Sequence, residues 1–130
     1  MNEFFSPLLF ACGLVALLSV PLIFSLVPPN GLFGIRTRRT TMCPDNWYRA
    51  NHFGGWCILI ASLVSALLLV LIPMAGEIST PAYIALFAVP QLIAAVTALA
   101  YTYVLPAPQR INPHEAHIAE LLGQMCASTE

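Results

Sequence analysis

Three long stretches of this sequence contain no charged residue, and they limit what the chain can fold into more than any other feature. They run over residues 8–27, 53–74 and 82–105. An α-helix rises about 1.5 Å per residue, so each stretch is long enough to cross the hydrocarbon core of a bilayer, about 30 Å thick. We therefore predict an all-α integral membrane protein forming a single three-helix bundle over residues 1–130.

The overall composition agrees with a membrane protein. Hydrophobic residues make up 58% of the chain and charged residues 8%, whereas soluble domains carry about 25% charged residues. This excludes a soluble globular domain. The first stretch is preceded by Glu3 rather than by a basic residue and ends at Pro28-Pro29-Asn30, which is no small-residue cleavage site. We therefore expect it to remain as a helix and not to be removed as a signal peptide.

The arginines predict the orientation of the spans. The connection over 75–81 carries only an acidic residue, Glu77. Positively charged connections remain in the cytoplasm, so we expect the N-terminus outside and both the loop over 28–52 and the tail over 106–130 inside. A net charge of -1 without a broad basic face argues against a nucleic-acid partner. The arginines of these two inner segments are Arg36, Arg38, Arg39, Arg49 and Arg110.

Polar residues within the spans allow two interpretations. Gln91, beside Pro90, is the most polar, and no Asp, Glu, Lys, Arg or His lies in any span. Such residues either line a transport pathway or form hydrogen bonds between helices, and the second is the commoner arrangement. Small residues spaced four apart predict a close packing or homo-oligomer face on the second and third spans. They are Ala61 with Ser65 and Ala94 with Ala98.

The segment between the first two spans has the most unusual sequence. Residues 36–41 mix guanidinium groups with hydroxyls, which suits an anion such as a phosphate or carboxylate. Pro44 fits the first position of a helix, with Asp45 in its first turn. One interpretation is a positively charged anchor with an aromatic belt that attracts anionic lipid headgroups. The other is a structured cytoplasmic loop, or cap, that binds a specific partner.

The order of residues in this segment resembles the SdpI family of small bacterial membrane proteins. That family has a Pro-Pro-Asn turn, then Gly-hydrophobic-Arg-Thr-x-x-Thr, then Trp-x-x-x-Asn-x-x-Gly-Gly between two spans. The resemblance covers roughly residues 20–105 of this chain. It is carried by Pro29, Asn30, Gly34, Ile35, Arg36, Thr37, Thr40, Trp47, Asn51, Gly54 and Gly55.

The resemblance implies a multi-pass protein of the bacterial cytoplasmic (inner) membrane. The family includes an immunity protein that protects a cell from a secreted peptide toxin and draws a transcriptional repressor to the membrane; that protein has an additional helical half that this sequence lacks. By this resemblance we expect a non-enzymatic immunity or signalling protein whose cap binds a peptide toxin, a lipid or a regulatory protein. The expected binding residues are Asn30, Arg36, Thr37, Thr40, Trp47 and Asn51.

Three alternatives to partner binding by these residues remain. The same residues, with Gly54 and Gly55, can instead hold the cap's own fold together. The second alternative is a small oligomeric transporter or lipid-handling protein. An enzyme acting on a phosphorylated lipid, with His52 or Asp45 as acid–base group, is disfavoured because no nucleophile accompanies them.

The cysteines and the tail suggest neither a disulfide nor a cofactor. The cysteines at 12, 43, 57 and 126 form no C-x-x-C pair. His114 and His117 have helical spacing, but nothing fixes a third metal ligand. Asn112-Pro113 resembles a helix start, and the apolar residues after it predict a short amphipathic helix. These are Ile118, Leu121, Leu122 and Met125.

Overall fold

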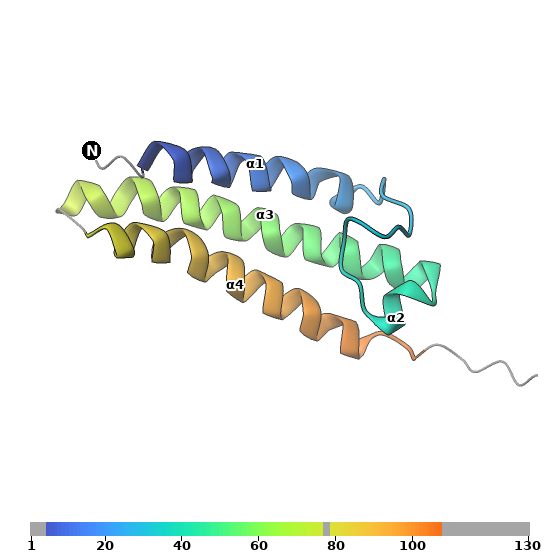
Figure 1. The fold of residues 1–130 in the computed structure, drawn as a ribbon. Helices are drawn as coiled ribbons and strands as arrows, with labels where there is room; N and C mark the ends of the chain where they lie inside the picture. Colours follow the sequence, from blue (N-terminus) through green and yellow to red (C-terminus); the bar gives the residue numbers. More distant parts are fainter. Residues whose placement is uncertain (1–4, 77–78, 108–130) are drawn as a thin grey trace, which may run out of the picture.

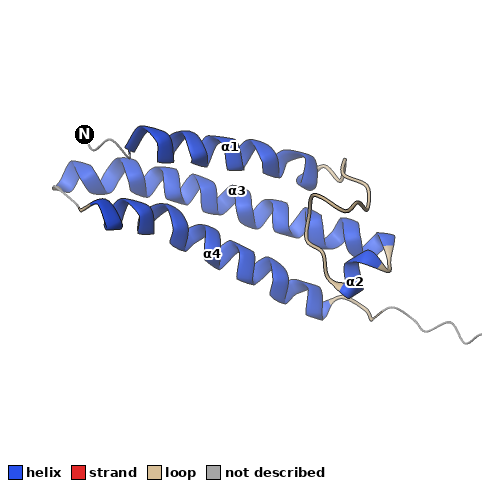
Figure 2. Cartoon of the chain, in the orientation of Figure 1, coloured by secondary structure: helices blue, strands red, loops and turns tan. Residues whose placement is uncertain are grey.

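The structure, a computed structural model, describes residues 5–76 and 79–107. The described residues form four helices joined by turns and loops: α1 (Phe5–Ile23), α2 (Arg38–Thr41), α3 (Pro44–Ala75) and α4 (Thr80–Val104) (Figure 2). α1, α3 and α4 are long and apolar enough to cross a membrane. The predicted all-α membrane bundle is confirmed, whereas the amphipathic helix expected in the tail lies outside the described residues.

The three long helices lie side by side with α3 in the middle (Figure 1). α3 contacts both neighbours extensively, whereas α1 and α4 touch each other at few points. The direction of the chain alternates from α1 to α3 to α4, so the start of α1 and the α3–α4 connection lie at one end of the bundle. The long connection between α1 and α3 and the end of α4 lie at the other end. We call residues 24–55, which include α2 and the first turns of α3, the cap.

The first helix is shifted toward the N-terminus relative to the prediction. We expected it over 8–27, but α1 ends at Ile23. The Ser25 amide donates to the Leu22 carbonyl, and the Leu26 amide donates to the Pro21 carbonyl. Ser25 has a φ of 55°. These bonds form a Schellman motif, which usually has glycine at the left-handed position. Because this position is a serine, the end of α1 could not be predicted from the sequence.

The second span begins earlier than expected because it is continuous with the cap. The predicted helix start at Pro44 is confirmed. The segment predicted between the first two spans, over 28–52, contains the first turns of this helix, since α3 continues from Pro44 through the whole span. Its 32 residues correspond to about 48 Å, more than the hydrocarbon core requires. The helix is therefore longer than a span requires, and its first turns carry cap residues.

Close packing of α3 on α4 depends on the small residues identified in the sequence. Ala61, Ser65, Ala94 and Ala98 are all buried. Side chains at this interface also form hydrogen bonds: Gln91 Nε2 donates to Ser62 Oγ (3.2 Å), and Ser65 Oγ donates to the Phe87 carbonyl (3.2 Å). Hydrogen bonding between helices, the interpretation favoured for Gln91, is confirmed.

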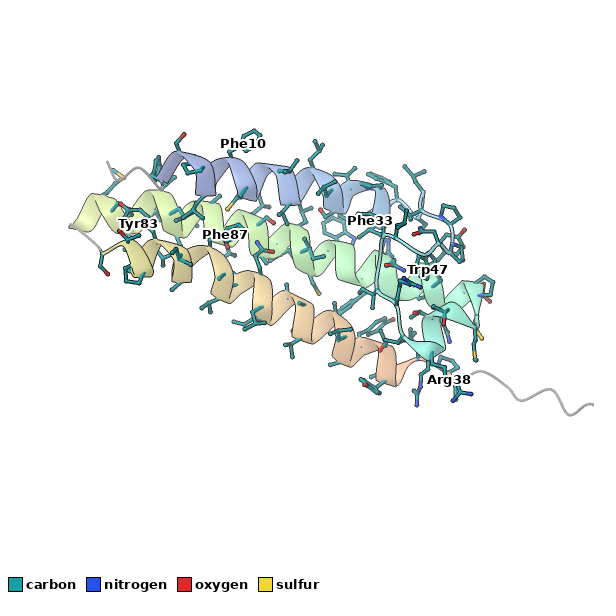
Figure 3. The ribbon with its side chains drawn as sticks, in the orientation of Figure 1. Phe10, Phe33, Arg38, Trp47, Tyr83 and Phe87 are labelled. Carbon is teal, nitrogen blue, oxygen red and sulfur yellow. The ribbon has the colours of Figure 1, made fainter. Side chains whose placement is uncertain are left out.

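The core is narrow, and the outer surfaces of the long helices are apolar. A buried cluster of Cys12, Leu69 and Tyr83 joins the three helices at the end away from the cap. Figure 3 shows Tyr83 and Phe87 directed toward neighbouring helices and Phe10 directed away from the bundle. Phe10 is 74% exposed. Such a surface is expected where lipid chains, and not water, surround the protein.

Candidate functional site

The cap begins with a turn that is closed by one amide side chain. Asn30 Oδ1 accepts hydrogen bonds from the backbone amides of Leu32 and Phe33, each at 2.8 Å. Asn30 Nδ2 donates to the Pro28 carbonyl, also at 2.8 Å. An asparagine that bonds to its neighbouring backbone in this way stabilises a turn without help from the rest of the chain. The Arg36 guanidinium donates to the Gly31 carbonyl and so fastens the far side of the turn.

Trp47 and Asn51 attach the loop to the first turns of α3. Trp47 is 0% exposed, and its Nε1 donates to the Val27 carbonyl at 2.9 Å. Asn51 is also buried; it donates through Nδ2 to the Trp47 carbonyl (2.8 Å) and accepts through Oδ1 from the Ile35 amide (2.6 Å). These two side chains, one turn apart on α3, hold loop segments before and after the first turn. They fix the loop across the top of the bundle.

Gly34 is required where the loop passes over these residues. Its φ is 113°, a conformation that side chains with a Cβ rarely adopt. A Cβ at this position would lie 2.5 Å from Asn51 Oδ1 and 3.2 Å from Trp47 Cζ2. Any other residue would therefore separate the loop from α3 and disturb the hydrogen bond between Asn51 and Ile35.

Thr37 and Thr40 form a second group of hydrogen bonds, at the start of α2. The buried Thr40 Oγ1 accepts from the Thr37 amide at 2.9 Å. The same hydroxyl lies 2.9 Å from the Ile35 carbonyl and 3.0 Å from the Thr37 carbonyl, to either of which it can donate its single proton. Its single proton is therefore used within the cap, so this buried hydroxyl does not donate to a ligand.

Two further side chains attach the cap to the end of α4. Arg39 donates to the carbonyls of Tyr103 and Leu105, the latter at 2.9 Å. Asn46 Nδ2 donates to the carbonyls of Arg39 (3.2 Å) and Pro106 (2.9 Å). The last carbonyls of a helix lack donors within the helix, and a cation near them is favourable. Nothing near Asn46 in the sequence singles it out, because one of its acceptors, the Pro106 carbonyl just after α4, lies 60 residues away in the chain.

A histidine and a glycine hold the end of α1 against α3, and a second glycine admits the loop. The Ile23 carbonyl lies 2.6 Å from His52 Nδ1, and because a carbonyl only accepts, Nδ1 carries the proton. A Cβ on Gly55 would lie 2.9 Å from Ile23 Cγ1, and one on Gly54 would collide with the Ile35 side chain. The predicted close approach at Gly54 and Gly55 is confirmed, and His52 acts here as a cap for α1.

The remaining positive charges of the cap face outward. Arg36, Arg38 and Arg49 are exposed, and Figure 3 shows Arg38 extending away from the bundle near the end of α4. The guanidinium groups of Arg38 and Arg49 form no hydrogen bond or ion pair with another described residue. Within residues 5–76 and 79–107, no group of three or more metal-binding side chains comes together; His114 and His117 lie outside that part of the chain.

A sequence model of the SdpI/YfhL protein family matches residues 26–102. The chain belongs to this family. No curated protein and no solved structure matches the chain. The matched region begins at the loop after α1, includes the cap from residue 26 onward and extends almost to the end of α4. The family resemblance expected from the cap sequence is therefore confirmed.

The structure brings the six predicted binding residues of this SdpI-family chain together in one cap. They differ in what they offer to a partner. Thr40, Trp47 and Asn51 are buried, and their polar atoms bond to the chain's own backbone. Asn30 and Thr37 are half-buried and support turns, whereas Arg36 is exposed. The hydrogen bonds of all six residues stabilise the fold of the cap. Among the six, Arg36 is the residue that offers an exposed charge.

Proposed function

We propose that this SdpI-family protein is a non-enzymatic immunity or signalling protein of the bacterial cytoplasmic membrane. Its N-terminus lies outside, and its cap lies in the cytoplasm. The cap binds a regulatory protein or a peptide toxin through its exposed arginines. Asn30, Thr37, Thr40, Trp47 and Asn51 act in this proposal by fixing the surface that carries those arginines.

The observation that supports this proposal is that the buried and the exposed polar side chains of the cap have different roles. Its buried polar atoms bond to the protein backbone, as in the contact of Asn51 with Ile35, while Arg36 and Arg38 remain exposed within three residues of each other. Guanidinium groups bind carboxylates through paired hydrogen bonds. A fixed surface bearing them loses little conformational freedom when a partner binds, which favours affinity.

The other candidate functions have less support from the geometry. A transporter would use polar groups inside the membrane to contact its cargo, but the Gln91 amide bonds to Ser62 between α3 and α4. An enzyme would need an acid–base group facing a substrate, but His52 Nδ1 bonds to the Ile23 carbonyl at the end of α1. Each group has a structural use that accounts for its presence.

A toxin-protection assay tests the proposal. The full chain is expressed in a sensitive bacterium, which is then challenged with a panel of membrane-active peptide toxins. We expect wild type to protect and the double variant Arg36→Ala/Arg38→Ala to lose about tenfold or more in protection, because charge-assisted contacts contribute about 1.5–3 kcal/mol each. Arg49→Ala, which removes an exposed arginine from another face, should protect like wild type at equal membrane levels.

Two results would contradict the proposal. Equal protection by the double variant and wild type would show that Arg36 and Arg38 bind no partner. An equal loss in Arg49→Ala would show that total charge, and not the surface formed by Arg36 and Arg38, determines protection. Failure of wild type to protect against the whole panel would favour the transporter or lipid-handling alternative.

A further inference from the structure

One face of α3 is covered by neither neighbouring helix. Gly55 contacts the end of α1, and Gly54 contacts Ala98 of α4, so both neighbours lie on other sides of α3. The uncovered face contains exposed residues spaced three or four apart, which places them in one row along the helix. From the cap toward the middle of the span they are Arg49, His52, Trp56, Ile60, Leu63 and Leu67.

Along this row, the side chains change from charged to apolar in the same order as the layers of a bilayer. A cation comes first, then an imidazole, then an indole, and then aliphatic side chains only. Trp56 is 46% exposed, and tryptophan favours the boundary between hydrocarbon and headgroups. Arg49 lies seven residues nearer the cap, about 10 Å further along the axis. The headgroup layer of one leaflet is about 5–8 Å thick, so the flexible Arg49 side chain reaches the height of the phosphates.

The end of α1 lies at the same height. His52 bonds to the carbonyl of Ile23, the last residue of α1, so the uncovered face of α3 changes from apolar to polar where α1 ends. Phe24 and Leu26, just beyond that point, are exposed and apolar. Both helices therefore place the hydrocarbon boundary near His52 and Trp56.

We infer that Arg49, His52 and Trp56 form a binding site for an anionic phospholipid whose headgroup carries a hydroxyl, such as phosphatidylglycerol. The Arg49 guanidinium binds the phosphate, for which its paired donors are suited. His52 is exposed, and a neutral imidazole that donates through Nδ1 accepts at Nε2. Nε2 therefore accepts from a headgroup hydroxyl. The indole of Trp56 supports the glycerol region, and one acyl chain follows Ile60 and Leu63.

This site is separate from the partner surface of the proposed function. It uses the uncovered face of α3, whereas Arg38 lies on α2 near the end of α4 (Figure 3). Asp45, one turn further from the membrane than Arg49, makes no ion pair with it among the described residues. The Arg49 guanidinium is therefore available, and its removal breaks no contact within the cap.

Fluorescence quenching in a bilayer of known composition tests the site. The full chain is reconstituted into phosphatidylcholine vesicles that contain the same small fraction of either brominated phosphatidylglycerol or brominated phosphatidylcholine. The protein has two tryptophans; Trp47 is buried in the cap, so quenching by brominated chains reports on Trp56. We expect about a fivefold preference for phosphatidylglycerol at Trp56, the effect of one basic side chain on an anionic lipid.

Two variants and one competitor make the test specific. Arg49→Gln should abolish the preference, while Arg38→Gln, which removes the same charge elsewhere, should retain it. Unlabelled phosphatidylglycerol should displace its brominated form better than phosphatidylmethanol, which has the same charge but no headgroup hydroxyl. Circular dichroism of each variant checks that the helices are intact.

Several outcomes would overturn the inference. Equal quenching by the two brominated lipids would show that no anionic lipid is preferred at Trp56. An equal loss in Arg38→Gln would indicate attraction by total charge. Weak quenching by both lipids, together with crosslinking between two copies through this face, would show that a second copy covers it. Equal displacement by phosphatidylmethanol would refute the role of His52. None of these results depends on toxin protection, so the two proposals fail independently.

Discussion

The cap and the spans of this protein are held together in different ways. The cap has little apolar interior and relies on buried amides, hydroxyls and an indole that bond to the backbone, as Asn51 does with Ile35 and Trp47. The spans rely on small residues that allow α3 and α4 to approach, with few polar contacts such as the one between Gln91 and Ser62. In the cap each buried polar side-chain atom has a hydrogen-bond partner, whereas in the spans the packing of small side chains dominates.

This difference follows from the surroundings of each region. In the bilayer the backbone groups are satisfied within each helix, so side chains need only pack. The cap contains a long stretch of non-helical backbone, and every buried amide and carbonyl in it needs a partner. Loss of one polar side chain should therefore be more harmful in the cap than in a span.

The largest expected effect comes from Asn51→Leu. Leucine fills a similar volume but leaves the Ile35 amide without its acceptor, and Asn51 is nearly fully buried. We expect the free energy of unfolding to fall by about 2–3 kcal/mol, the cost of an unsatisfied buried group together with lost bonds. Denaturation in mixed micelles measures the change. Loosening of the cap should also shift the emission of the buried Trp47 to longer wavelength.

One outcome would contradict the prediction for Asn51→Leu. If Asn51→Leu leaves both the unfolding free energy and the tryptophan emission unchanged, the cap does not depend on this side chain. The comparison with the spans would then lose its basis. A shift in emission without loss of stability would indicate that the cap opens separately from the bundle.

An intermediate effect is expected where the cap meets the spans. Arg39→Gln removes donors from the carbonyls of Tyr103 and Leu105 at the end of α4. We expect a loss of about 1–2 kcal/mol, because a cation that caps a helix end in a partly buried setting contributes in this range. Arg38→Gln is the matched control, since the Arg38 side chain is exposed and its guanidinium bonds to no other described residue. Equal losses in the two variants would refute a specific contact with α4.

The sequence predicted the spans better than the cap for the same physical reason. Absence of charge over some twenty residues is a property of a whole segment, and the bilayer makes it sufficient to predict a helix. It determined the existence of all three spans and the burial of the small residues Ala61 and Ser65. The absence of charge did not determine the end of α1. The Schellman turn at Ser25 depends on a left-handed backbone conformation that a serine does not predict.

In the cap, the sequence identified the relevant residues but not their roles. The order from Asn30 to Asn51 indicated a structured cap, yet the same amides and hydroxyls suit a ligand or the protein's own backbone. Which of these applies depends on contacts between distant parts of the chain, such as Asn46 with the Pro106 carbonyl. Helix periodicity and composition carry no information on such contacts, so Asn46 and the capping role of His52 were missed.

The smallest expected effect comes from Gln91→Leu, the span counterpart of the Asn51 variant. Removing the Gln91 amide leaves Ser62 with a partner, since its hydroxyl donates to the Ile58 carbonyl at 2.8 Å. No buried group is stranded, and polar contacts between helices in membranes contribute about 0.6 kcal/mol on average. We therefore expect a change below about 1 kcal/mol in the same micelle denaturation, and no shift in tryptophan emission. A loss as large as that of Asn51→Leu would mean that the bond from Gln91 to Ser62 supports the bundle as strongly as the cap's bonds support the cap. The distinction between the regions would then lie in the number of polar contacts and not in how much each contributes.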